Sequence, residues 1–168
     1  ALVEKQRGHK PETAKDFRRV LDRNDIDTVI VATPDHWHAL PTVMACQAGL
    51  DVYVEKPLAT SIAEGRAMLT AAQKHNRVVQ MGTQWRSGKH WAEAVEFVRS
   101  GKLGKVGLVR GWAHHNWLGN VGNPPDSEPP AGVDYDMWLG PAPKRPFNKI
   151  RLHFNFRWFW DYAGGLMT

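Results

Sequence analysis

The chain has 168 residues with 42% hydrophobic and 23% charged side chains, ordinary globular usage with room for one domain or parts of two. Its formal net charge of +5 is scattered rather than clustered, so we predict no nucleic-acid interface. The single cysteine, Cys46, excludes an internal disulfide, and no apolar run approaches the roughly 18 residues of a membrane span.

Strand and helix signals alternate through the first half of the chain. Apolar stripes predict helices at 11–23, from Ala39 to Ala48, and from Ser61 to about His75. Short runs rich in β-branched residues predict strands at 28–33, 51–54 and 78–81. The first strand is apolar throughout, so we expect it to be covered on both faces. This order predicts a doubly wound parallel sheet of the α/β class with right-handed crossovers.

Two details of this half are specific enough to test. The segment Ser61-Ile62-Ala63-Glu64 is a capping box, and the helix that it opens has Ile62, Met68, Leu69 and Ala72 on its apolar face. Cys46 lies on the packing face of the helix before it, so we expect a buried, inert thiol.

The sequence changes character near residue 84, where we place a domain boundary. Most of the eight tryptophans follow it. Beyond it the pattern predicts a helix at 88–100, a longer strand at 106–113, a long loop at 116–134 and a helical turn at 136–141. The glycines of 101–107 precede a strand instead of following one, so we interpret them as a turn and find no G-x-G-x-x-G fingerprint.

Glu55-Lys56-Pro57 ends the second predicted strand. Pro57 fixes its own φ and removes a donor, so the strand stops there and Lys56 leaves the sheet at a defined point. The carboxyl ends of parallel strands are where open α/β sheets bind ligands. The sequence therefore makes Lys56 a candidate functional residue, with a surface ion pair as the plain alternative.

The segment Thr33-Pro34-Asp35-His36-Trp37-His38 follows the first predicted strand and precedes a helix. Such a loop brings free helix N–H groups and two imidazoles to the same edge of the sheet. Taken alone, Asp35 is most simply a helix N-cap and His36 a solvated loop residue. Because no third ligand lies at a suitable spacing from the two histidines, we predict no metal site.

Four motifs in the order of this chain resemble the Gfo/Idh/MocA family of NAD(P)-dependent oxidoreductases. They are the segments 29–38, 55–59, 82–87 and 101–106. The resemblance implies that 1–84 is the C-terminal part of a Rossmann domain that binds NAD or NADP. It implies that 85–168 is the N-terminal part of an α/β substrate domain with a mostly antiparallel sheet. The implied activity is hydride transfer between the nicotinamide and a hydroxyl carbon of a sugar, inositol or related polyol.

The resemblance also assigns site residues. Lys56 matches the lysine that contacts substrate hydroxyl and cofactor, and is the implied catalytic residue. The residues implied to bind the cofactor are Thr33, Pro34, Asp35, His38, Glu55, Lys56, Pro57 and Gln84. Many relatives have Asn where this chain has Asp35. The residues assigned to the substrate are Lys56, Arg86, His115, Trp117, Arg157 and Trp160.

Some of these assignments have structural alternatives. Trp117 is either an aromatic platform for a sugar or a core residue, and His115 is either a substrate contact or a surface residue. Arg157 and Trp160 either contact substrate or pack in a core, with a salt bridge to Asp161. Oxidation of an alcohol requires loss of its proton as hydride leaves, and a lysine can take that proton or stabilise the alkoxide.

The chain departs from the family by lacking the opening glycine fingerprint and the Asp and His that complete the catalytic group. We therefore interpret residues 1–168 as an internal fragment, with the missing His as the expected base and Lys56 as its electrostatic partner. An alternative is an enzyme that cleaves glycosides by transient oxidation with bound NAD. A third is a non-catalytic sensor.

The resemblance and the composition also suggest partners and location. We expect a small-molecule substrate, no nucleic-acid or membrane partner, and a homo-oligomer, either dimer or tetramer. The expected location is cytoplasmic, or periplasmic if an export signal lies upstream.

Overall fold

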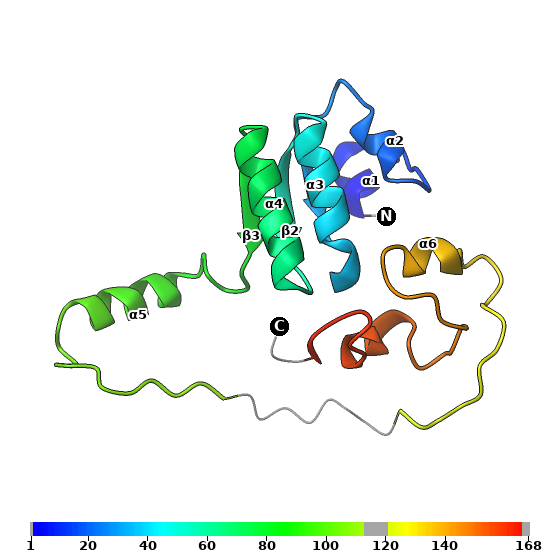
Figure 1. The fold of residues 1–168 in the computed structure, drawn as a ribbon. Coiled ribbons are helices and arrows are strands. Elements are labelled where there is room, and N and C mark those ends of the chain that lie inside the picture. The colour runs from blue at the N-terminus through cyan, green and yellow to red at the C-terminus, as the bar shows by residue number, and fades with distance from the viewer. Residues whose placement is uncertain (1, 113–120, 166–168) are drawn as a thin grey trace.

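The computed structural model describes residues 2–112 and 121–165 and is built around one parallel sheet. The elements are α1 (Leu2–Arg7), α2 (Arg18–Leu21), β1 (Thr28–Val31), η1 (Asp35–Trp37), α3 (Ala39–Gln47), β2 (Asp51–Glu55), α4 (Ile62–Lys74), β3 (Val79–Gly82), α5 (Lys89–Arg99), α6 (Tyr135–Leu139) and η2 (His153–Trp158). The described strands pair in the order β1-β2-β3, all parallel. Figure 1 shows α3 and α4 side by side over this sheet. The predicted α/β class with a parallel sheet is confirmed, and in the described residues α3 and α4 cover one face of that sheet.

The two faces of the sheet differ in burial. Val52 and Val54 of the central strand are 2% and 0% exposed, because they point to the face that α3 and α4 cover. The alternate residues Ile30, Tyr53 and Gln80 are register partners on the opposite face, and all three are exposed. The expectation that the first strand is covered on both faces is therefore wrong: Ile30 is 74% exposed.

The hydrophobic core lies between the covered face of the sheet and the helices α3 and α4. Val31, Val52 and Val54 from the strands meet Cys46 of α3 and Met68 of α4. Cys46 is fully buried, as predicted, and burial raises the pKa of its thiol above the ordinary value. A thiol with a raised pKa is a poor nucleophile at neutral pH, which agrees with a packing role.

The helix predicted over 11–23 is mostly absent, and only Arg18–Leu21 is helical. The carboxylate of Asp16 accepts hydrogen bonds from the backbone N–H of Arg18 and from its guanidinium. An aspartate bonded to the backbone two residues ahead favours a turn over a helix. The apolar stripe of 11–23 survives only in part, with Val20 and Leu21 half-buried.

The capping box at the start of α4 is confirmed. The Ser61 hydroxyl accepts from the backbone N–H of Glu64, and the Glu64 carboxylate accepts from that of Ser61. The predicted apolar face is only partly right, since Met68 is buried but Ile62 is 87% exposed and Leu69 is 48% exposed. Ile62 is the first residue after the cap and points away from the sheet side that Met68 and Ala71 fill.

The second half of the chain contributes helices but no described strand. α5 matches the predicted helix at 88–100, and α6 matches the predicted turn with Asp134 as its N-cap. Residues 106–112 of the predicted longer strand are exposed and pair with nothing, and no antiparallel sheet occurs in the described part. A strand needs a neighbour for its backbone hydrogen bonds, and this segment runs away from the sheet (Figure 1).

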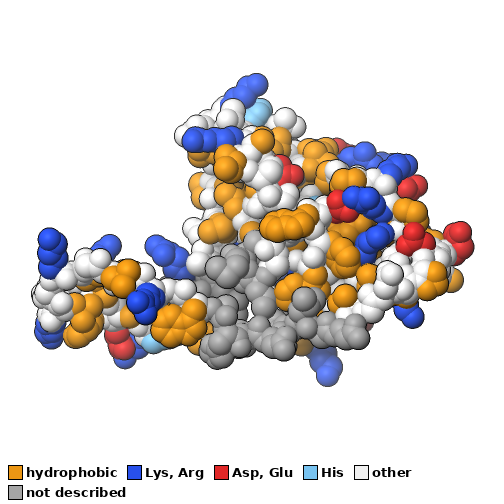
Figure 2. All heavy atoms as spheres, turned by 60° about the horizontal axis from the view of Figure 1, so that its bottom comes forward, with side chains coloured by type: hydrophobic (Ala, Val, Ile, Leu, Met, Phe, Trp, Pro, Cys, Tyr) orange, Lys and Arg blue, Asp and Glu red, His pale blue; other side chains and the backbone are white. Residues whose placement is uncertain are grey.

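α5 stands apart from the rest of the molecule and buries no side chain. Figure 2 shows hydrophobic side chains open on this projecting lobe. Trp91 of α5 is 50% exposed. None of the described helices combines the length and the apolar composition that crossing a membrane requires.

Candidate functional site

The carboxyl ends of β1 and β2 place the two sequence motifs side by side. Val31 pairs with Val54 in the parallel register, so the loop that begins at Ala32 and the exit at Glu55 leave the same edge of the sheet. Glu55 in turn pairs with Gly82 at the end of β3. The edge where ligands bind in open α/β sheets is therefore built from three successive strand ends.

His38 joins the two loops of this edge. Its Nδ1 lies 2.5 Å from the carbonyl oxygen of Pro57, and its Nε2 lies 2.9 Å from that of Thr33. The side chain is only 1% exposed. Both ring nitrogens therefore face protein oxygens, and His38 connects the two loops.

Asp35 brings three distant segments into one electrostatic environment. It is half-buried, and this burial raises the pKa of its carboxyl group above the ordinary value. The charges of His38, Lys56 and Arg157 oppose that shift, so these groups lie close enough to act on the carboxylate. Asp35 is not the predicted N-cap, because Pro34 occupies that position of η1 and no side chain caps it.

Lys56 leaves β2 with its side chain exposed, and the Lys56-Pro57 peptide bond is cis. The structure thus brings Lys56, Asp35 and Arg157 to one edge from sequence positions more than 20 residues apart. Asp35 and Lys56 were predicted to face the cofactor, and Arg157 the substrate.

Thr33, Glu55 and Gln84 also line hollows at this edge. Thr33 and Pro34 line a cleft of about 490 Å³, described below. Glu55 and Gln84 border a hollow of about 340 Å³, and Gln84 and Arg86 border a second of about 250 Å³ against α5. The predicted residues are therefore distributed over neighbouring hollows instead of meeting at one point. His115 and Trp117 lie outside the described residues.

The guanidinium of Arg157 lies 3.7 Å from the centre of the Phe154 ring. The predicted salt bridge to Asp161 is wrong, because Asp161 pairs with Arg145 through an Nε–Oδ2 contact of 2.8 Å. The packing role for Trp160 is also wrong, since its side chain is 90% exposed. The stacking on Phe154 holds the guanidinium plane in place without neutralising its charge.

His36 and Trp37 attach α6 to this edge by hydrogen bonds. The sequence did not predict this contact. The Trp138 carbonyl oxygen accepts hydrogen bonds from His36 Nε2 at 2.9 Å and from Trp37 Nε1 at 3.0 Å. The predicted solvated position of His36 is wrong: it is 4% exposed, with its ring against those of Trp138 and Tyr162. Burial lowers the pKa of His36, which keeps the ring neutral near pH 7.

Gly140, just after α6, completes this contact between α6 and the loop at 35–38, which we call the joint. Its φ is +47°, and a Cβ there would lie 2.0 Å from Cζ2 of the Trp37 ring. Only glycine lets the chain after α6 pass this close to the indole.

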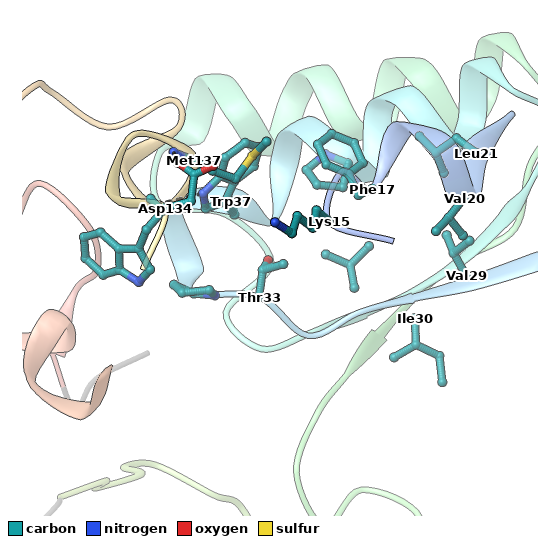
Figure 3. A pocket seen from close by; sticks show the side chains of 14 residues that line it. Lys15, Phe17, Val20, Leu21, Val29, Ile30, Thr33, Trp37, Asp134 and Met137 are labelled. Atoms are coloured by element: carbon teal, nitrogen blue, oxygen red, sulfur yellow. Dashed lines mark hydrogen bonds between the residues drawn. The ribbon is translucent and has the colours of Figure 1, made fainter. Parts of the chain in front are cut away.

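A cleft of about 490 Å³ lies beside β1, and Figure 3 shows the side chains that line it. Its wall comes from Phe17 before α2, from Thr33 and Trp37 of the loop, and from Met137 of α6. Lys15 lines it as well and had no sequence signal, because its place beside Thr33 depends on how the chain folds. Within the described residues, no group of three His, Cys, Asp or Glu side chains could hold a metal ion.

Comparison with known proteins identifies relatives of both halves of the chain. Residues 3–83 match a family model described as an oxidoreductase family with an NAD-binding Rossmann fold. Residues 97–168 match a model described as the C-terminal alpha/beta domain of an oxidoreductase family. Together the two models span most of the chain.

Individual relatives act on sugars according to their names. The chain is 31% identical over 112 residues to levoglucosan dehydrogenase of Pseudarthrobacter phenanthrenivorans, covering 67% of this chain and 29% of that protein. It is 31% identical over 108 residues to an alpha-N-acetylgalactosaminidase of Shewanella oneidensis, covering 62% and 24%. A solved levoglucosan dehydrogenase in complex with NADH and levoglucosan matches with a TM-score of 0.55 at 31% identity, covering 62% and 28%. The chain thus spans under a third of the length of these relatives.

Replacing Gly140 by alanine should separate α6 from the loop after β1. Gly140→Ala adds a Cβ that the Trp37 ring cannot accommodate, in addition to the strain of a positive φ. Gly132→Ala is the matched control, because its φ is +84° but a Cβ there meets nothing within 4 Å. We expect Gly140→Ala to lower the free energy of unfolding in urea by about 1–3 kcal/mol more than the control. Equal losses in the two variants would show that the close approach of Gly140 to Trp37 does not contribute to stability.

Acid should weaken the same joint through His36. The unfolded chain binds a proton near pH 6.5 but the folded chain only at lower pH, so stability is full above 6.5 and falls below it. The loss is at most about 1.4 kcal/mol per pH unit. His36→Gln keeps an N–H for the Trp138 carbonyl without this titration, and should lose less stability between pH 7 and pH 5.

Urea unfolding at several pH values measures this effect. His9→Gln is the control, since His9 is exposed and distant in sequence. An acid response of His36→Gln equal to that of the unmodified chain would show that His36 is not the titrating group.

Proposed function

Because the chain belongs to the Gfo/Idh/MocA oxidoreductase family, we propose that the protein transfers hydride between a nicotinamide cofactor and a hydroxyl carbon of a sugar or related polyol. The observation that supports this most is the position of Lys56. It leaves the carboxyl end of a parallel strand within electrostatic reach of Asp35, beside the loop that begins at Thr33. We assign residues 1–84 to cofactor binding and 85–168 to the substrate side.

The residues present fit one part of a nicotinamide dinucleotide. The cleft beside Thr33 and Pro34 offers flat aromatic walls, and Glu55 and Lys56 supply polar groups at the same edge. The 168 residues contain no G-x-G-x-x-G segment, so the chain's own contacts to the cofactor are those at the ends of β1, β2 and β3. When bound, the cofactor supplies the acceptor for hydride.

Lys56 acts on the substrate oxygen in this proposal. As the hydroxyl carbon loses hydride, its proton passes to a base and negative charge develops on the oxygen. A charged Lys56 amine hydrogen-bonded to that oxygen stabilises the developing charge, which lowers the barrier because the interaction is strongest in the transition state. Asp35 lies within electrostatic reach of the same group.

In this proposal Arg157 and Trp160 contact the substrate. The Arg157 guanidinium lies over the Phe154 ring and donates hydrogen bonds to sugar hydroxyls in this proposal. Trp160 is almost fully exposed, so its indole face is open for the apolar face of a sugar ring.

A second candidate is cleavage of a glycoside by transient oxidation and elimination. It is supported by the similarity to the alpha-N-acetylgalactosaminidase. The two candidates differ in what accumulates, because a dehydrogenase forms NADH with each turnover whereas the second reaction regenerates its bound cofactor. Assays with levoglucosan and with a p-nitrophenyl glycoside, each followed for NADH and for released product, separate them.

Removing the amine of Lys56 should abolish most of the activity. We expect Lys56→Ala to lower kcat/KM by roughly 10²–10⁴-fold, the usual contribution of a positioned proton-transfer or electrostatic group. Lys74→Ala is the control, because Lys74 is exposed at the end of α4 and distant from the edge. The measurement is NADH formation by the protein at its natural length. Unchanged turnover in Lys56→Ala would end the catalytic assignment.

A further inference from the structure

A polar hollow of about 340 Å³ lies at the end of β3, where the chain turns toward α5 (Figure 1). The aromatic side chains of Tyr53 and Trp85 line it, together with the polar side chains of Glu55, Gln84 and Ser87. Within the described residues, neither the Gln84 amide nor the Ser87 hydroxyl makes a hydrogen bond. The hollow therefore combines flat rings with hydrogen-bonding groups that are open to a ligand.

Two glycines shape the walls of this hollow. A Cβ at Gly82 would lie 2.8 Å from the Tyr53 ring, and a Cβ at Gly88 would lie 2.5 Å from the His90 ring. The His90 ring in turn meets the Trp85 ring edge to face, with the ring centroids 5.3 Å apart. The backbone thus passes close to one aromatic wall and to the residue that supports the other.

Trp85 stands at a turn position that usually belongs to glycine. The backbone N–H of Arg86 donates to the carbonyl oxygen of Thr83 at 3.2 Å, which closes a turn with Trp85 as its third residue. The φ of Trp85 is +68°, a conformation that bulky side chains rarely adopt. Its indole is 65% exposed, so core packing does not account for a tryptophan here. Backbone strain beneath an exposed aromatic ring points to a binding role for the ring itself.

We propose that this hollow binds an uncharged sugar ring, with the indole of Trp85 as its stacking platform. The inference rests on the proposed function and adds a residue that no motif assignment contains. The C–H face of a sugar packs on an aromatic ring, while its hydroxyls bond to polar groups around the ring. Glu55 precedes Lys56 and pairs with Gly82 in the strand register, so the hollow begins at the strand end that presents Lys56.

The charge of the lining indicates which sugars fit. Within the described residues, Glu55 is the only charged side chain that lines the hollow. No cation of the lining is therefore available to pair with the carboxylate of a sugar acid, and the Glu55 carboxylate repels it. Glucose should bind more tightly than glucuronate, which has a carboxylate at C6.

Two partners in the proposed reaction have this chemistry, the sugar substrate and the ribose of the nicotinamide nucleotide. Titration calorimetry of the protein at its natural length separates them. NADH is titrated into the free protein, and levoglucosan or glucose is titrated into the protein with NADH bound. A variant that loses sugar affinity alone assigns the ring to the substrate, and one that loses NADH affinity alone assigns it to the cofactor.

Trp85→Asn is the decisive variant, because asparagine accepts a positive φ and the change removes only the indole. We expect it to raise one of these Kd values by about tenfold with no fall in Tm, and Trp85→Phe to recover part of the loss. If the ring belongs to the substrate, KM rises and kcat changes little, because a platform away from the reacting carbon binds ground and transition states alike.

Trp112→Asn is the matched control, since Trp112 is 77% exposed and does not line the hollow. An equal loss of affinity in Trp112→Asn overturns the proposal. Unchanged Kd values for both NADH and sugar in Trp85→Asn do so as well. Tighter binding of glucuronate than of glucose overturns the assignment to an uncharged sugar.

Failure of the proposed function gives a different pattern. An unmodified protein that binds levoglucosan or glucose but forms no NADH from either overturns hydride transfer alone, and the affinities of Trp85→Asn still decide the hollow. A protein that oxidises a sugar, and whose Trp85→Asn variant keeps both KM and the Kd of NADH, overturns the hollow alone. An unmodified protein that binds neither NADH nor either sugar overturns both.

Discussion

The side chain of His38 holds the ends of β1 and β2 together, and the candidate site depends on this contact. Its two ring nitrogens face the carbonyl oxygens of Thr33 and Pro57 inside a nearly closed environment. Backbone carbonyls at a buried strand exit need a donor, because an unsatisfied one costs about 1–3 kcal/mol. By bridging these two carbonyl groups, the His38 ring links Pro57, the neighbour of Lys56, to the loop that contains Asp35.

The Trp138 carbonyl is the second fixed point. It accepts from both His36 and Trp37, so one peptide of α6 is tied to the residues just before His38. This attaches the segment 134–165 to the edge of the sheet and brings Arg157 within electrostatic reach of Asp35. Four consecutive residues, Asp35 to His38, thus contain the carboxylate of the site and the side chains that make both structural contacts.

Two apolar surfaces of the described residues remain exposed to solvent. On the uncovered face of the sheet, Ile30 and Tyr53 are exposed, and α5 buries none of its side chains. Exposed apolar surface of this kind has a free-energy cost in water. The edge with Lys56 is different, since it exposes charged groups beside aromatic ones such as Trp160.

The sequence determined the strands, α3, α4 and the place of Lys56 at a strand exit, because apolar runs, a capping box and Pro57 are local signals. The helix predicted over 11–23 is wrong, because Asp16 turns the chain there. The strand predicted at 106–113 is not formed by residues 106–112, because they have no strand to pair with. Only the tertiary structure showed His36 buried, Asp161 paired with Arg145, and Lys15 in a cleft with Thr33. Those facts depend on which distant segments pack together, and local pattern does not encode that.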